Sequence, residues 1–506
     1  MGSMFFQESF TSSVDFPTYI PWQTLSSDLS DKLKHGSIRI NRSNRVEYAT
    51  IQEEGTPLLE NGTRKGDGPI TDGSIVTEAV KGGTSWPVAS FLLVNAALGA
   101  GVLNYPYAYD KAGGVYFAAF LQIIMMFILI CTMLVLVHSA DVNRDTTYHD
   151  VLLSLCGRRA QQCAAVSILL TCYGICITFL IIIGDQYDRL FLSLFEKEFC
   201  ISWYLDRRFT IAITAFIFIL PMCYFQRLDF LRYASTLGIF AMLYPVFLTV
   251  YEYYKLGATQ AGKVKVFPDS AVQVFVVIPV FSFAYQTHEI VVPVYACMKE
   301  RNIRNFTKAT FLAMGILFFI YCMAGSFGYV TFGSNIAPDI MEQYNARDPI
   351  VLVGIGALVI KMITTYPQLV LCGRGALDGL YAEFANLTTD QFIKGEFKRR
   401  IVVTSLWFCT TVLLAVLAPN IGVVIELLGC LASVNIFIFP GLCLIALCFR
   451  SDEYLENWKS QAKVAVACAM IAFGTFVFGV VFTKVIMYDM MSHGSPSPAP
   501  SHFKCS

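Results

Sequence analysis

Charged residues are scarce in this chain, and the few that it has balance one another. Only 15% of the 506 residues are charged, with 37 of each sign, so the formal net charge is zero. A protein that binds nucleic acid through its phosphates needs a basic surface, and the balance therefore argues against a nucleic-acid partner. The opening MGSMFFQESF carries neither a basic region nor an apolar run, so we expect no cleaved signal peptide.

Motifs of soluble catalysis and of metal binding are also missing. The 16 cysteines include no C-x-x-C pair, and most of them fall in apolar segments, where cysteine serves as a small buried hydrophobe. We find no phosphate-binding glycine loop and no nucleophile–base set in a water-accessible segment, and so expect neither an enzyme nor a resident cofactor. The charged ring or repeated filter of an ion channel is not visible either.

Apolar residues dominate instead, at 55% of the chain. They gather in segments long enough to cross the roughly 30 Å hydrocarbon core of a lipid bilayer. This pattern predicts an all-α membrane protein with about eleven transmembrane helices. The predicted spans are residues 86–108, 114–138, 160–185, 209–225, 235–255, 271–297, 309–333, 349–374, 401–419, 421–448 and 463–487.

The two ends of the chain differ from this central domain, residues 85–487. Residues 1–84 are polar and without periodicity, which predicts a disordered tail. Residues 488–506 are rich in Ser and Pro and predict a second, short tail. Lys and Arg are more frequent in the loops that share a side with the N-terminus, and such loops are typically cytosolic. We therefore expect a cytosolic N-terminus and, with an odd number of spans, a C-terminus on the other side.

Two of the predicted spans are interrupted by residues that disfavour a continuous helix. The first contains the run NAALGAG, from Asn95 to Gly101. In the sixth, Pro279 and Pro293 bracket the polar patch Gln286-Thr287-His288-Glu289. Unpaired backbone is tolerated at membrane depth only where it is buried in protein or lines a cavity. Because the breaks are five spans apart, they predict an inverted five-plus-five repeat with a binding site at its interface.

Several motifs together resemble a known family. They are NAALGAGVLNYP followed by KAGG, FLIIIGDQYD in span three, FAYQTHEIVVPVY in span six and IFIFPGLCL in span ten. They are similar to the amino acid/auxin permease superfamily and, within it, to the sodium-coupled neutral amino acid transporters of solute carrier family 38. The branch most resembled transports glutamine and asparagine in lysosomes. The resemblance covers about residues 84–487 and implies a LeuT-like fold.

The broken helices then predict where an amino acid would bind. Helix N-termini attract a carboxylate, and unwound carbonyl groups accept hydrogen bonds from an ammonium group. Glycine lets the backbone approach the substrate closely. We expect Phe283 or Tyr285 to act as an aromatic gate, with ordinary helix packing as the alternative. The predicted substrate-binding residues are Asn95, Gly99, Ala100, Gly101, Phe283, Ala284 and Tyr285.

A coupling-ion site is implied by the resemblance, in which Asn95 and Thr365 match positions with that role for Na⁺. The alternative for Thr365 is that it satisfies backbone freed by Pro367. Lys361 lies one helical turn before Thr365, on the same face, and departs from the family pattern. A charged residue at mid-membrane suggests a function, so we expect Lys361 to replace part of the sodium and to favour proton coupling. Glu426 is its predicted partner, and a purely structural Lys361–Glu426 pair is the alternative.

Other titratable residues have weaker claims. His288, beside Glu289 in the sixth span, is a candidate pH sensor because histidine changes charge near neutral pH; the alternative is a hydrogen-bonded helix-end histidine. Asp185, Asp188 and Arg189 close span three, and we expect them to form a solvated helix end.

The N-terminal tail carries two short patterns that resemble endolysosomal sorting signals. Tyr48-Ala-Thr-Ile51 fits a tyrosine-based signal, and Glu54 precedes the pair Leu58-Leu59 as in an acidic dileucine signal. They predict recognition by clathrin adaptors and a lysosomal or late endosomal membrane, with the plasma membrane as the alternative.

The sequence as a whole predicts a secondary active transporter of neutral L-amino acids, glutamine or asparagine first, driven by Na⁺ or H⁺. Its partners would be the amino acid and the lipid bilayer. The alternative is an amino-acid sensor that binds its ligand in the same pocket and signals through the cytosolic tail.

Overall fold

The structure, a computed structural model, describes residues 84–199, 202–224, 232–257, 264–385, 389–417, 421–450 and 458–490. The regular secondary structure of these residues is helical, apart from one isolated bridge between Thr84 and Met298, and loops join the helices. The predicted all-α class is therefore confirmed. The sorting patterns and most of both tails lie outside the described residues.

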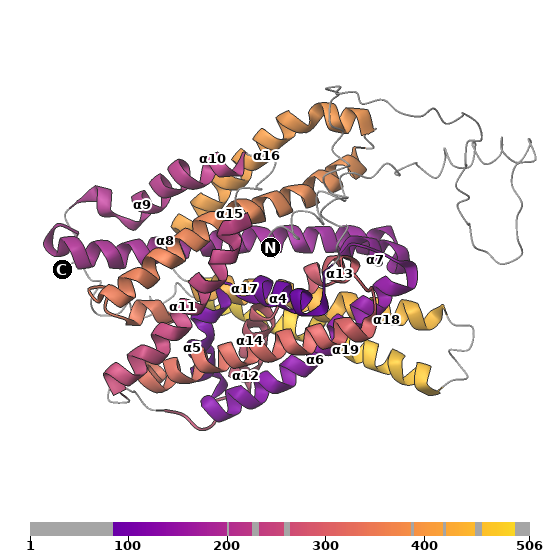
Figure 1. Cartoon of the computed structure of the whole chain (residues 1–506), viewed down its shortest axis with the longest axis horizontal. Coiled ribbons are helices and arrows are strands. Elements are labelled where there is room, and N and C mark those ends of the chain that lie inside the picture. The colour runs from indigo at the N-terminus through magenta and orange to yellow at the C-terminus, as the bar shows by residue number, and fades with distance from the viewer. Residues whose placement is uncertain are drawn as a thin grey trace, which may run out of the picture. The chain divides into compact units, whose positions relative to one another are not determined.

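The helices follow one another along the chain with short connections (Figure 1). Three of them contain or end in a π-helical stretch: η2 (Ala215–Ile219), η7 (Val434–Ile438) and η8 (Val485–Met490). The α-helices are α4 (Trp86–Ala97), α5 (Gly101–Ala112), α6 (Val115–Asn143), α7 (Tyr148–Cys156), α8 (Arg158–Phe199), α9 (Arg207–Thr214), α10 (Leu220–Cys223), α11 (Arg232–Leu256), α12 (Ala271–Ala284), α13 (His288–Ala296), α14 (Ile303–Phe332), α15 (Pro349–Phe384), α16 (Thr389–Leu417), α17 (Ile421–Ser433), α18 (Phe439–Phe449) and α19 (Trp458–Lys484).

The helices match the predicted spans in order. In the described part of the chain, eight helical segments are long and apolar enough to cross a membrane, and α4 with α5 makes a ninth if the bent pair is one span. The predicted fourth and fifth spans coincide with α9–η2–α10 and with α11, which do not meet that criterion. Chain order and composition thus fit the predicted architecture, while the structure supports up to nine membrane-spanning segments by length and apolarity.

Both predicted breaks are present. α4 and α5 are separated by three residues and bent by 70°. α12 and α13 are separated by Tyr285, Gln286 and Thr287, between the two prolines. Proline removes a backbone donor and disfavours the helical turn before it, and glycine relaxes the backbone, so the sequence opens both helices at the expected places.

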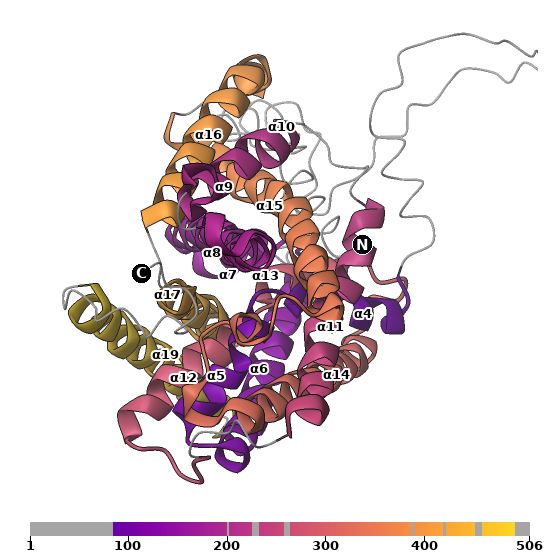
Figure 2. The same cartoon turned by 90° about the vertical axis from the view of Figure 1, so that its left-hand side faces the viewer.

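The broken helices lie in the interior and α19 lies at the edge. α8 and α15 pack against each other along their length and lie side by side in both views (Figures 1 and 2). In the most apolar stretch of the α12–α13 segment 76% is buried, and in that of α8 67%, against 22% in α19. The interior is therefore formed by the broken helices and by α8.

The loops sort into two sets, as alternating spans require. Arg301, which precedes α14, donates to the carbonyl groups of Ala140, in the last turn of α6, and of Asp145, just after that helix. Arg450, after α18, donates to Ser154 in α7. At the other set, Arg189 near the end of α8 donates to the carbonyl of Tyr344 between α14 and α15. The grouping agrees with the predicted sidedness, and which set faces the cytosol stays a prediction.

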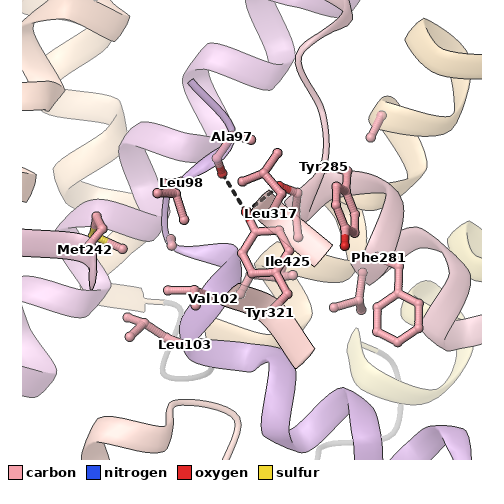
Figure 3. Close-up of a cluster of buried hydrophobic side chains, with 14 of the residues drawn as sticks. Ala97, Leu98, Val102, Leu103, Met242, Phe281, Tyr285, Leu317, Tyr321 and Ile425 are labelled. Atoms are coloured by element: carbon pink, nitrogen blue, oxygen red, sulfur yellow. Dashed lines mark hydrogen bonds between the residues drawn. The ribbon is translucent and has the colours of Figure 1, made fainter. Parts of the chain in front are cut away.

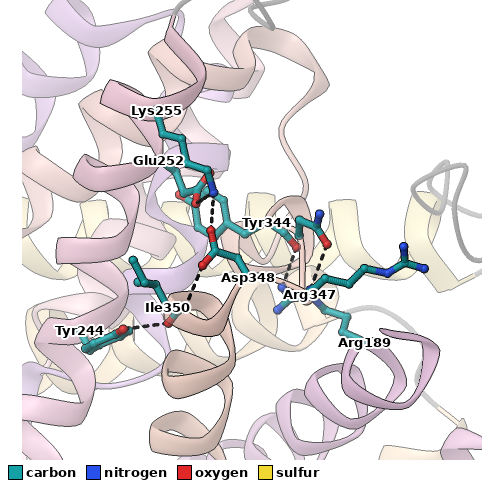
Figure 4. Close-up of polar contacts among 9 residues, drawn as sticks. Arg189, Tyr244, Glu252, Lys255, Tyr344, Arg347, Asp348 and Ile350 are labelled. Atoms are coloured by element: carbon teal, nitrogen blue, oxygen red, sulfur yellow. Dashed lines mark hydrogen bonds and ion pairs between the residues drawn. The ribbon is translucent and has the colours of Figure 1, made fainter. Parts of the chain in front are cut away.

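The end of α8 differs from the expectation. The Arg189 side chain is only 3% exposed and also donates to Gln186, and Asp185 pairs with Arg207 of α9 at 2.8 Å. The expected solvated helix end is wrong for Arg189, because the loop before α15 folds over it. Figure 4 shows this loop fixed further by contacts of Lys255 with Glu252 and Asp348, and by the bond from Tyr244 to the Ile350 carbonyl.

A cavity between the two broken helices

A cavity of about 170 Å³ lies where the two breaks meet. Its lining comes from all of residues 95–101, from the second break with the first turn of α13, and from one face each of α8 and α15. It is smaller than the roughly 300–1,000 Å³ of drug-sized pockets, and so suits a small metabolite.

The first break brings backbone to the cavity. The Leu98 amide donates to Val94, and the Val102 amide donates to Gly99. The Leu103 amide likewise donates to Ala100, whereas the amides of Gly99, Ala100 and Gly101, the first residue of α5, have no backbone acceptor among the described residues. A Cβ atom on Gly101 would lie 3.0 Å from the Cβ of Ala284. Glycine is needed here for α5 to approach the end of α12, whereas at Gly99 a Cβ would meet only open space and one carbonyl at 3.9 Å.

One side chain joins the C-terminal ends of α4 and α12, which are the first halves of the two broken helices. The Tyr321 hydroxyl of α14 donates to the carbonyl of Ala97, the last residue of α4, at 2.9 Å, and to that of Ala284, the last residue of α12, at 2.8 Å (Figure 3). The Tyr321 ring stacks on Tyr105 at 4.6 Å between centroids. A hydroxyl has one proton, so the two carbonyl groups share a single donor. No sequence pattern points to Tyr321, because a tyrosine does not interrupt an apolar helix.

Several oxygen atoms around the cavity are buried and lack a hydrogen-bond donor among the described residues. They are Asn95 Oδ1, Gln286 Oε1 and Thr287 Oγ1. Buried polar atoms are nearly always hydrogen-bonded in folded proteins. An unpaired set at one cavity therefore indicates a place that a donor-rich ligand or a cation completes.

The predicted substrate residues lie at this cavity with one exception. Asn95, Gly99, Ala100, Gly101, Phe283 and Ala284 line it. Tyr285 does not: it is fully buried, packs edge-on against Tyr321, and its hydroxyl accepts a hydrogen bond from Gln122 at 2.7 Å. These contacts favour the helix-packing alternative for Tyr285, and the gating role of Phe283 stays a prediction.

The predicted ion-coupling residues separate into two groups. Thr365 and Lys361 of α15 line the cavity together with Asn95. Glu426 of α17 does not: its carboxylate accepts hydrogen bonds from Lys484 of α19 at 2.7 and 3.0 Å. The predicted Lys361–Glu426 pair is wrong in both its coupling and its structural form, because α17 presents Glu426 to α19.

The ammonium group of Lys361 has no hydrogen bond or ion pair within the described part of the chain, although the residue is only 8% exposed. Its side chain passes over Gly238 of α11, where a Cβ atom would lie 2.8 Å from Nζ. A residue that lines a cavity and whose ammonium group has no described protein partner can take part in binding a ligand.

His288 and Glu289, adjacent in α13, point to different places. His288 is fully buried, and its Nε2 lies 2.8 Å from the Thr132 hydroxyl of α6. It does not line the cavity, and its burial favours the hydrogen-bonded alternative over the sensor. Glu289 does line the cavity. In the sequence, Glu289 is distinguished only as the neighbour of His288.

Comparison with known proteins agrees with this geometry. Residues 82–485 match the family model described as transmembrane amino acid transporter protein. The chain belongs to the transmembrane amino acid transporter family. It is 37% identical to the sodium-coupled neutral amino acid transporter 7 of Danio rerio, over 82% of this chain and 90% of that protein. The proteins of the same name from Xenopus laevis and Homo sapiens are 36% and 33% identical, over 90% and 81% of this chain and 99% and 90% of theirs.

The family membership confirms the expected class: this is a multi-pass membrane protein that transports amino acids, and not an enzyme. The transporter's cavity lies at the pair of helix breaks from which its transport site was predicted.

Proposed function

We propose that this protein is a secondary active transporter that moves neutral L-amino acids, glutamine or asparagine first, by alternating access around the two broken helices. The observation that carries the proposal is the cavity between the breaks, with its unpaired oxygen atoms and its half-helix ends. Half-helix ends that face a cavity are a recurrent means of binding charged substrate groups in transporters.

The substrate's two charged groups have opposite requirements. The N–H groups of Gly99, Ala100 and Gly101 suit the carboxylate, because they are donors without a described backbone acceptor at the positive end of the α5 dipole. The ends of α4 and α12 suit the ammonium group. The Ala97 and Ala284 carbonyl groups keep a second lone pair beside the shared Tyr321 bond.

Sodium is the proposed coupling ion, as the relatives' name suggests. Asn95 Oδ1, which lacks a donor, and the Thr365 hydroxyl offer the neutral oxygen ligands that a hard cation prefers. Lys361 lines the same cavity and would repel a cation there, so it weakens the sodium site or replaces the ion when protonated.

The test is uptake of radiolabelled glutamine into proteoliposomes, with sodium and pH gradients imposed separately. Uptake driven by sodium is expected, and would support Asn95 and Thr365 as ion ligands. Uptake driven by protons alone would assign coupling to Lys361. Binding of glutamine without uptake under either gradient would overturn the transporter proposal in favour of the sensor.

We further propose the lysosomal or late endosomal membrane as the site of action, from the sorting patterns at residues 48–51 and 54–59. Changing Leu58 and Leu59 to Ala should send the protein to the cell surface, as seen by surface biotinylation. Changing the nearby Leu25 and Leu29 to Ala provides the control. A protein that stays in lysosomes after the first change would contradict the dileucine signal.

A further inference from the structure

Glu289 is the only acidic side chain among the described residues that line the cavity, and Lys361 is the only basic one. A charge within a membrane protein is costly and is normally paired. Glu289 forms no ion pair in the described part of the chain. A carboxylate in this position needs a donor from elsewhere, and the cavity is where that donor can enter.

The carboxylate is held in a fixed orientation by its neighbours. Glu289 Oε1 accepts hydrogen bonds from Gln286 Nε2 and, at 2.9 Å, from Asn435 Nδ2 of η7. Asn435 is itself fixed by the Ser167 hydroxyl of α8, which donates to its Oδ1 at 2.8 Å. Both side-chain bonds fall on Oε1, and the backbone amide of Glu289 also faces the carboxylate, so no other side chain of the described residues donates to Oε2. The network therefore positions one oxygen and leaves the other for a ligand.

The place of Glu289 indicates which end of a substrate it meets. The main-chain groups of an amino acid are matched by the ends of α4 and α12, which Tyr321 ties to α14. Glu289 belongs to the other side of the second break, on the first turn of α13, and is anchored to α8 and η7. An acceptor tied to different helices from those that hold the main chain is suited to the substrate's side chain.

We propose that Glu289 is the specificity residue of this cavity, with Oε2 accepting a hydrogen bond from a terminal N–H group on the substrate's side chain. The inference rests on the proposed function and names its substrate class. The N–H group can belong to a carboxamide, as in glutamine, or to a cationic side chain, as in lysine. Side chains of similar length without a donor, such as methionine, are disfavoured, and that of glutamate is repelled.

The test compares Glu289→Gln with the wild type in competition against radiolabelled alanine uptake, with glutamine, lysine, methionine and glutamate as competitors. A hydrogen bond to a charged acceptor is strong, so the apparent affinity for glutamine or lysine should fall roughly 10- to 100-fold. The apparent affinity for methionine and the KM for alanine should change much less than the apparent affinity for glutamine or lysine, and the apparent affinity for glutamate should rise. Whichever of glutamine and lysine loses affinity identifies the source of the N–H group.

Two controls separate this role from a structural one. Glu396→Gln removes a carboxylate on α16 that pairs with Arg400, and should leave the selectivity of the wild type. Glu289→Asp keeps the charge and should restore part of the preference lost in Glu289→Gln. An equal loss for all amino acids, alanine included, would assign Glu289 to the common ammonium group and overturn the proposal, as would unchanged selectivity.

Ligand-induced thermal stabilisation of the purified protein gives a readout that does not require transport. Glutamine or lysine should stabilise the wild type more than methionine does, and the difference should vanish in Glu289→Gln. If no amino acid is taken up but this difference is observed, the transport proposal fails and the specificity proposal stands. If uptake occurs and the difference is absent, the specificity proposal fails alone.

Discussion

Lys361 is the residue whose local environment is least balanced. Lys361 is almost wholly buried and lines the cavity, and its ammonium group has no partner among the described residues. A buried charge without a partner lowers the stability of the folded protein. Because Lys361 lines the same cavity as Asn95 and Thr365, its charge would compete with a cation bound there.

Changing Lys361 to Met should therefore strengthen sodium binding. Removing one positive charge from the cavity is expected to lower the half-saturating sodium concentration about 3- to 10-fold, in line with a coupling of roughly 1 kcal/mol or more between close charges at an intermediate dielectric constant. The measurement is the sodium dependence of glutamine uptake at several pH values. Lys308→Met, at an exposed position of α14, is the control, and unchanged sodium and pH dependence in Lys361→Met would contradict the role.

Residue-level prediction from the sequence succeeded where backbone chemistry decides and failed where packing decides. Asn95 and Gly101 were found because polar and glycine residues interrupt an apolar run. Glu426 was assigned to the wrong lysine, because its partner Lys484 is 58 positions away and the facing of two helices cannot be read from their periodicity. Tyr285 was misplaced for the same reason.

At the scale of helices, a single hydroxyl group forms hydrogen bonds to both breaks. The carbonyl groups at the ends of α4 and α12 are without helical partners, and both accept from Tyr321. Glycine, proline and polar residues predicted each break on its own. That one side chain of α14 joins them depends on how the helices pack, which no local pattern encodes.

Changing Tyr321 to Phe removes that shared donor and keeps the ring that stacks on Tyr105. A buried acceptor left without its donor costs about 1–3 kcal/mol, so the two halves should lose their fixed relative position. We expect the maximal uptake rate per folded molecule to fall about tenfold, with a smaller change in KM.

A matched variant is Tyr244→Phe, which removes a hydroxyl that donates to the carbonyl of Ile350 at 2.8 Å, where neither residue lines the cavity. It should reduce stability and leave the rate per folded molecule near that of the wild type. If Tyr321→Phe only lowers the amount of folded protein, as measured by size-exclusion chromatography, Tyr321 is a structural residue and not a positioning one.

At the scale of the whole molecule, the loop between α14 and α15 binds two helices from the first part of the chain, through Asn104 of α5 and Arg189 of α8. Asp339 of this loop accepts from the Met341 amide at 2.8 Å and from Gln186 of α8 at 3.3 Å. Burial raises the pKa of Asp339 to about 7 and that of Glu342 to about 9. The negative charge of Asp185 raises both pKa values further. The positive charge of Arg189 lowers both, and that of Arg207 also lowers the pKa of Glu342.

These raised pKa values predict the direction in which pH changes stability. Carboxyl groups with ordinary pKa values near 4 in the unfolded chain hold their protons to a higher pH in the folded protein. The folded state therefore binds more protons between about pH 4 and the raised values, and stability falls as pH rises through that window. In the predicted topology this loop faces the non-cytosolic side, so an acidic lumen would favour the folded arrangement.

The melting temperature in detergent should accordingly be higher at pH 5 than at pH 8, by an amount on the order of 5 °C. Combining Asp339→Asn with Glu342→Gln should raise the melting temperature at pH 8 and flatten the pH dependence, because neutral amides cannot carry the buried charge. Asp269→Asn, at an exposed carboxylate paired with Lys265, should leave the dependence of the wild type. A melting temperature that rises from pH 5 to pH 8 would show that the loop's carboxylates are ionised and stabilised by Arg189 and Arg207, contrary to the burial that we hold responsible.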